Sequence, residues 1–236
     1  IAANASTSPE KTRALFEESL SRSIEAARLA VSTNPAGFGN WETLGTIYSA
    51  LVPKPLAVEG AYENAKLGYN EALKRNPSNP ELYLRLAQLE LNKGDTEQAR
   101  SYIRSSIALK DDYADAYLML AQLEVAAGNV SAAIASTERL AALVPNNPGL
   151  YFELGLLKYS NGDYNGAEKA LYQALVLSPE YANAKYYLGL TLSQLGRFGE
   201  AQSEFEDLLR TNPGNADIEN AIQAVSRGRV PAVRTQ

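Results

Sequence analysis

Side chains that commonly do chemistry in proteins are few in this chain. Its 236 residues include no His and no Cys, which excludes Ser-His and Cys-His nucleophilic pairs and every metal site that needs a His or Cys ligand. The carboxylates are dispersed along the sequence, and no Gly-rich phosphate-binding motif occurs. We therefore expect a protein that is not an enzyme, with no catalytic residue, no cofactor and no metal.

One fragment has the spacing of a calcium site. Asn161, Asp163, Asn165 and Gly166 copy the opening of an EF-hand loop. The closing Glu of such a loop supplies a bidentate ligand, and its position holds Tyr172 here. The alternative interpretation is a turn between two helices, which the missing ligand favours.

The charge balance limits the possible partners. The chain has 22 Lys and Arg against 27 Asp and Glu, a net charge of −5, whereas a nucleic-acid partner requires a clustered basic face. No stretch approaches the roughly 20 apolar residues of a membrane span. We expect no nucleic-acid partner and no direct membrane insertion. Because Ile1 and not Met comes first, we expect a piece of a longer or processed chain. The sequence leaves its localisation open between the bacterial cytoplasm and the extracytoplasmic side of a membrane-anchored parent.

An internal period organises most of the sequence. Small and turn-forming residues recur at a spacing of 34, and several independent columns at one spacing indicate a repeat array. The columns are Gly94, Gly128, Gly162 and Gly196; Ala65, Ala99, Ala133, Ala167 and Ala201; and Pro77, Pro145, Pro179 and Pro213.

The pattern within one period predicts a pair of helices. Tyr83, Leu86 and Leu89 recur at helical intervals. Gly94 follows where the first helix must end, in a left-handed conformation that glycine adopts easily. Asn79-Pro80 has the form of an N-cap followed by the first helical residue. Such a pair has apolar faces on both sides, and only stacking on its neighbours can bury them.

One of these units resembles a known family. The residues Trp41, Leu44, Gly45 and Tyr48 have the spacing of the tetratricopeptide signature, and the resemblance extends over residues 38–213. It implies an all-α, right-handed α-α superhelix of about five helix-turn-helix repeats, with an N-terminal helix and a C-terminal capping helix.

The repeat columns also set the expected boundaries. Eight extra residues fall in the first repeat within Leu51–Gly60, either as a tolerated surface loop or as a lip that contacts a partner. The expected segments are a polar leader and N-terminal helix forming a partial repeat at 1–37, repeats at 38–79, 80–113, 114–147, 148–181 and 182–215, a capping helix at 216–227 and a disordered tail at 228–236.

The resemblance also implies a binding groove. In tetratricopeptide arrays the first helix of each repeat lines the concave side, and an exposed apolar stripe there indicates a partner. The aromatic members of the groove are its expected anchors. The alternative is that these residues pack against the neighbouring helix. By position, the groove residues are Leu84, Gln88, Leu91, Leu118, Gln122, Val125, Phe152, Leu156, Tyr159, Tyr186 and Leu190.

The leading functional hypothesis is a non-catalytic scaffold for protein–protein interaction that binds a peptide or protein segment in this groove. A second hypothesis is a structural, self-assembling protein that forms homo-oligomers, because Leu15, Phe16 and Leu20 form an apolar face in an incomplete first repeat. Thirdly, the opening stretch and the insertion resemble, more weakly, the repeat arm of bacterial membrane proteins of the O-antigen-ligase type. That resemblance implies an accessory arm of a larger protein.

Overall fold

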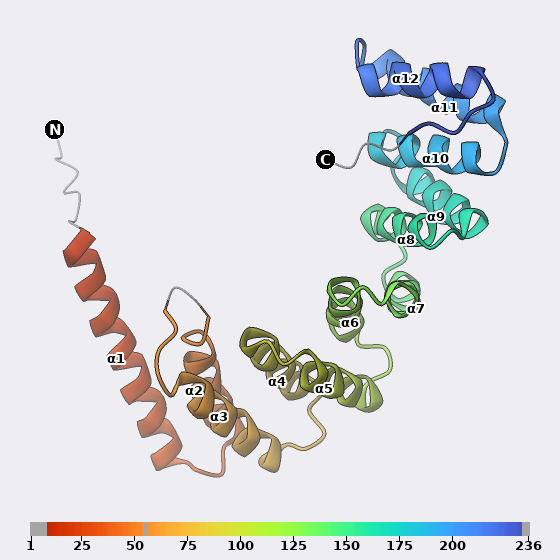
Figure 1. The fold of residues 1–236 in the computed structure, drawn as a ribbon. Coiled ribbons are helices and arrows are strands. Elements are labelled where there is room, and N and C mark those ends of the chain that lie inside the picture. The colour runs from red at the N-terminus through yellow and green to blue at the C-terminus, as the bar shows by residue number, and fades with distance from the viewer. Residues whose placement is uncertain (1–8, 54–55, 233–236) are drawn as a thin grey trace. The chain divides into compact units, whose positions relative to one another are not determined.

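The computed structural model describes residues 9–53 and 56–232, and all regular structure in that part of the chain is helical (Figure 1). The chain divides into two compact units at residues 116 and 117, and each is described by itself. The helices are α1 (Pro9–Thr33), α2 (Phe38–Ser49), α3 (Ala61–Arg75), α4 (Pro80–Lys93), α5 (Thr96–Leu109), α6 (Ala114–Ala126), α7 (Val130–Leu143), α8 (Pro148–Ser160), α9 (Tyr164–Leu177), α10 (Ala182–Gln194), α11 (Phe198–Thr211) and α12 (Ala216–Ser226).

Helix pairs joined by short turns build the first unit, as α4 and α5 illustrate. The Asn79 side chain accepts a hydrogen bond from the Glu81 N–H at 2.9 Å and caps α4, which begins at Pro80. Gly94 ends α4 with φ of +92°, a left-handed conformation that favours glycine. Asp95 then caps α5 by accepting from the Gln98 N–H at 3.0 Å. The helix-pair prediction is confirmed here, together with the N-cap and the left-handed glycine.

The calcium-like fragment forms a turn of the same kind in the second unit. Gly162 has φ of +78° after α8, and the carboxylate of Asp163 accepts a hydrogen bond from the Gly166 N–H at 2.9 Å. Asp163 is therefore the N-cap of α9, which agrees with the turn interpretation.

The core of the first unit joins α1, α2, α3 and α4. Tyr69 is almost fully buried, and Leu51, the first residue of the insertion, joins the same cluster. The Val58 N–H donates to the Leu51 carbonyl at 2.9 Å and closes the loop, while the Leu56 and Val58 side chains are exposed. Residues 54–55 lie outside the described part. The insertion is an anchored loop, and its role as a contact lip stays a prediction.

Helix α1 is buried only towards its end. Ala27 and Val31 join the core of the first unit, whereas Leu15 and Phe16 are exposed. Leu15 and Phe16 of the expected apolar face therefore lie at the surface, whereas Leu20 is half-buried against the core. Self-assembly through this face stays a prediction. No helix among the described residues has the length and apolar character needed to cross a membrane. The predicted polar leader, up to residue 8, lies outside the described residues.

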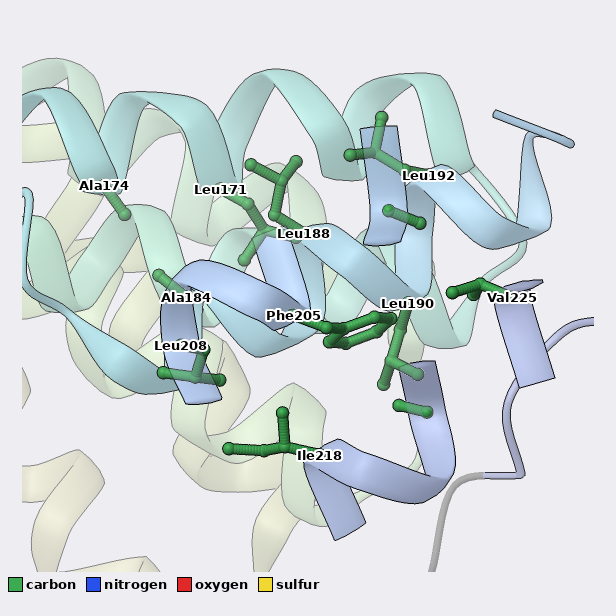
Figure 2. Close-up of a cluster of buried hydrophobic side chains, with 12 residues drawn as sticks. Leu171, Ala174, Ala184, Leu188, Leu190, Leu192, Phe205, Leu208, Ile218 and Val225 are labelled. Carbon is green, nitrogen blue, oxygen red and sulfur yellow. The ribbon is translucent and has the colours of Figure 1, made fainter. Parts of the chain in front are cut away.

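The core of the second unit gathers around Phe205. Its side chain is fully buried and lies among leucines of α10 and apolar residues of α12, including Leu190 and Ile218. Figure 2 shows the Phe205 ring pointing towards Leu190. Gly189 makes this possible, since a Cβ at that position would lie 2.6 Å from the Phe205 ring. The small repeat position thus lets α10 and α11 approach closely.

An ion pair also joins α10 and α11. Lys185 Nζ lies 2.6 Å from Asp207 Oδ2, and the Lys185 side chain is largely buried. The hydrogen bond from Lys185, together with one from Arg210, lowers the pKa of Asp207 to about 2. The same bond to Asp207 raises the pKa of Lys185. The charged pair therefore stabilises the fold over the whole neutral range.

Replacing this aspartate should give a pH-dependent loss of stability. Because the folded pKa of Asp207 is depressed, its contribution is present above the unfolded pKa of about 4 and is lost as the pH falls through about 2. We expect Asp207→Asn to be less stable than the native chain at pH 7, with a difference that shrinks steadily below pH 4. Urea unfolding of both proteins at pH 7, 5 and 3 measures this. A difference that does not change with pH would contradict the assignment.

The chain continues in order beyond α12, which corresponds to the expected capping helix at 216–227. Pro231 is buried and lines a cavity of its own unit. The expected disordered tail at 228–236 stays a prediction. Residues 233–236 lie outside the described part.

Candidate functional site

A cavity at the carboxyl end of the second unit is the best candidate site. It has a volume of about 780 Å³ and lies among α10, α12 and the segment that follows α12. The lining combines aromatic rings, asparagine amides and small apolar residues, as ligand sites commonly do. The residues that define the cavity are Ala182, Asn183, Tyr186, Tyr187, Leu208, Asn212, Asn215, Asp217, Ile218, Asn220, Ala221, Ala224, Pro231 and Ala232.

Tyr187 is at the centre of an aromatic cluster beside this cavity. Its ring centroid lies 5.9 Å from that of Phe152, 6.0 Å from that of Tyr159 and 5.9 Å from that of Tyr186, each in an edge-on arrangement. Such arrangements are the favourable ones for aromatic pairs. The rings are half-buried and pack against the core of the unit, so α8 and α10 hold them in place before any ligand arrives.

The phenol groups of this cluster are partly removed from water. Burial raises the pKa of Tyr186, and the nearby Asp217 carboxylate adds to the effect. Burial likewise raises the pKa of Tyr159, whose oxygen accepts a hydrogen bond from Gln194 at 3.4 Å. Both groups therefore stay neutral at physiological pH and serve as donors, acceptors and ring faces.

The polar part of the lining consists mainly of amides. Asn215 is committed to capping α12, because its oxygen accepts from the Asp217 and Ile218 N–H groups. Asn183 and Asn220 are exposed to the cavity, and an amide side chain can donate and accept at once. Asp217 is the only charged residue among the described residues of the lining, so the cavity carries one carboxylate and no cation.

The structure places the sequence-predicted groove residues in several environments. Phe152, Tyr159 and Tyr186 come together in the aromatic cluster, while Leu156 is half-buried on α8. Leu118, Gln122 and Val125 are exposed on α6. Gln88 is exposed and Leu91 half-buried on α4, which belongs to the first unit, so neither is part of the cavity.

Two of the groove residues require correction. Leu190 is fully buried, because it belongs to the core that α10 shares with α11 and α12. Leu84 is 6% exposed, because α4 contacts α2, α3 and α5 and is enclosed by them. For these two leucines, the packing alternative is the right one, and neither is free to contact a ligand.

Sequence reasoning missed Tyr187, Asn183, Asn220 and Pro231. The helical spacing could have identified two of them. Asn183 and Tyr187 are four residues apart and share one helix face with Tyr186, which was predicted to line the groove. Nothing in the repeat pattern pointed to Asn220 or Pro231. Both lie after the last repeat column, in α12 and in the segment that follows it.

Sequence comparisons agree with this architecture. One model of the tetratricopeptide repeat matches residues 56–108 and 158–225, and another matches residues 84–148. Together these matches cover well over half of the chain. A comparison with curated proteins gives no match.

Similar solved structures share the fold. The MamA protein is 25% identical, with a TM-score of 0.55, over 73% of this chain and 97% of MamA. YrrB, described as a tetratricopeptide repeat protein with an unusual peptide-binding site, is 18% identical, with a TM-score of 0.64, over 85% of this chain and 99% of YrrB. The C-terminal part of a repeat protein from Cytophaga hutchinsonii is 16% identical, with a TM-score of 0.65, over 85% of this chain and 78% of that one.

Proposed function

The chain belongs to the tetratricopeptide repeat family, and from this premise we propose that it binds an extended polypeptide segment in the cavity of its second unit. The fold of the family is that of a protein–protein interaction scaffold, and its members are generally non-catalytic. The observation that carries the proposal is the combination of the Tyr186 and Tyr187 rings with the amides of Asn183 and Asn220 in one cavity of about 780 Å³.

The chemistry of this lining fits a peptide. Aromatic rings held half-buried offer large contact areas at little cost in side-chain entropy, which is why they dominate many interfaces. The side-chain amide of Asn183 or Asn220 can pair with both the N–H and the C=O of a main chain, regardless of its sequence. The peptide site of YrrB supports the same assignment by fold alone. In this proposal the protein binds a partner polypeptide and does not catalyse a reaction.

Removing the Tyr187 ring should weaken peptide binding strongly. We expect dodecapeptides selected by display on the native chain to bind Tyr187→Ala at least about 30-fold more weakly, since a truncated aromatic anchor costs about 2 kcal/mol or more. Isothermal titration of the selected peptides measures the loss. Asn183→Ala is the second variant, because the exposed Asn183 amide can be removed without touching the core.

A matched control separates binding from folding. Tyr172 on α9 is 63% exposed and lies outside the cavity, so Tyr172→Ala should keep full affinity. Circular dichroism must show unchanged helicity in all three variants. Selected peptides that bind Tyr187→Ala and Asn183→Ala as tightly as the native chain, or a display that selects none, would rule out the cavity as the binding site.

A further inference from the structure

The segment after α12 turns sharply back towards its own unit. Gly228 has φ of +66°, and its N–H donates to the Val225 carbonyl at 2.9 Å. The Arg229 N–H then reaches back to the Ala224 carbonyl at 3.0 Å. These bonds satisfy the last carbonyls of α12 and reverse the chain direction, as a left-handed glycine commonly does at a helix end.

After this turn, the segment lies at the proposed peptide site. Figure 1 shows it in dark blue, running from the end of α12 back across α10. Pro231 is buried although Arg229 and Val230 on its amino side are exposed. Pro231 and Ala232 line the same cavity as Asn183 and Tyr187. One proline is thus inserted among the residues that we assign to ligand binding.

The chemistry of the segment matches that of the cavity. Proline fixes φ and favours an extended conformation, which lowers the entropy lost on binding. Arg227 and Arg229 precede the inserted residues, are exposed and do not line the cavity. The part of the segment that suits the site is therefore the extended Pro231–Ala232 stretch.

We propose that Pro231 and Ala232 cover part of the binding site as a ligand within the same chain, and that the external partner presents an extended, proline-containing segment that displaces them. This inference rests on the proposed function and adds the class of ligand and a means of regulation. The cavity then alternates between its own segment and the partner, and the partner's affinity is set by the competition.

The covalent link between the segment and its site sets how strongly the segment should compete with an external peptide. A segment joined by a short linker has an effective concentration of about 1 mM at its site. If such a short segment binds with a Kd of about 0.1 mM, it is seated about nine-tenths of the time and weakens an external ligand about tenfold. Releasing it should strengthen external binding by the same factor.

The test uses the full chain and a labelled hexapeptide, Arg-Gly-Arg-Val-Pro-Ala, which copies residues 227–232 and has blocked ends. Pro231→Asp should expel the segment, because an unpaired carboxylate is costly to bury. We expect fluorescence anisotropy to show the hexapeptide binding Pro231→Asp about tenfold more tightly than the native chain. Gln223→Asp adds the same charge on an exposed position of α12 and should behave like the native chain.

Further measurements distinguish the inference about the segment after α12 from the proposed peptide-binding function. Adding Tyr187→Ala to Pro231→Asp should abolish hexapeptide binding, which places the peptide in the cavity. If display-selected peptides bind through Tyr187 but bind Pro231→Asp no more tightly, or more weakly, the inference is overturned and the proposed function stands. If no peptide binds either chain, both are wrong. Amide nuclear Overhauser effects at Arg229, Val230 and Ala232 should also show an ordered segment in the native chain, and values typical of a flexible coil would contradict the proposal that the segment is bound in the site.

Discussion

Phe205→Ala should lower the free energy of unfolding of the second unit by about 3–5 kcal/mol, the usual cost of removing a buried phenylalanine side chain. Phe205 is fully buried, and its ring fits against the helix backbone at Gly189. Its centroid also lies 5.6 Å from that of Tyr186. The truncation therefore leaves a cavity in the core and removes the support beneath a residue of the candidate site.

The measurement should resolve the stability of each helix, because repeat arrays gain stability from contacts between neighbouring repeats. Hydrogen exchange followed by mass spectrometry should show lost protection in α10, α11 and α12. Tyr172→Ala, which removes an exposed ring from α9, should change protection by less than about 0.5 kcal/mol. Equal effects of the two variants would mean that Phe205 is not the centre of this core.

Gly68→Ala should cost the first unit about 2–3 kcal/mol, although alanine is the better helix former by about 1 kcal/mol. A Cβ at position 68 would lie 2.6 Å from the Gly45 nitrogen and 2.8 Å from the Trp41 carbonyl oxygen. These are backbone atoms and cannot rotate away, so α2 and α3 must separate. The separation would also disturb Tyr69, whose ring lies against Gly45.

Gly39→Ala is the matched control, since it lies in α2 and a Cβ there would have no atom within 4 Å. We expect it to be neutral or stabilising by up to about 1 kcal/mol. Urea unfolding monitored by the fluorescence of Trp41, the only tryptophan of the chain, reports on α2 directly. A Gly68→Ala variant as stable as Gly39→Ala would show that the two helices do not approach as closely as described.

The repeat period and the residues at the helix ends determined most of the fold. Asn79 and Gly94 act through hydrogen bonds and backbone conformations within a few residues of themselves, so their roles can be inferred without knowing what lies nearby. Gly45, a residue of the tetratricopeptide signature, also acts within one repeat, because it faces the Tyr69 ring of the partner helix. Asn215 acts locally in the same way, because its side chain accepts hydrogen bonds from the Asp217 and Ile218 N–H groups and caps α12.

The candidate site depended on contacts that no period encodes. Leu156 and Leu190 are one period apart, yet Leu156 is half-buried and Leu190 is fully buried. The difference arises because α12 shares a core with Leu190 at the end of the array. The sequence by itself determined which residues form helices and how each pair closes, since those are interactions between near neighbours. Only the tertiary structure decided that Tyr187 is the central ring, because this depends on α8 packing against α10. It also decided that Pro231 lines the cavity, because this depends on how the segment after the last repeat folds back.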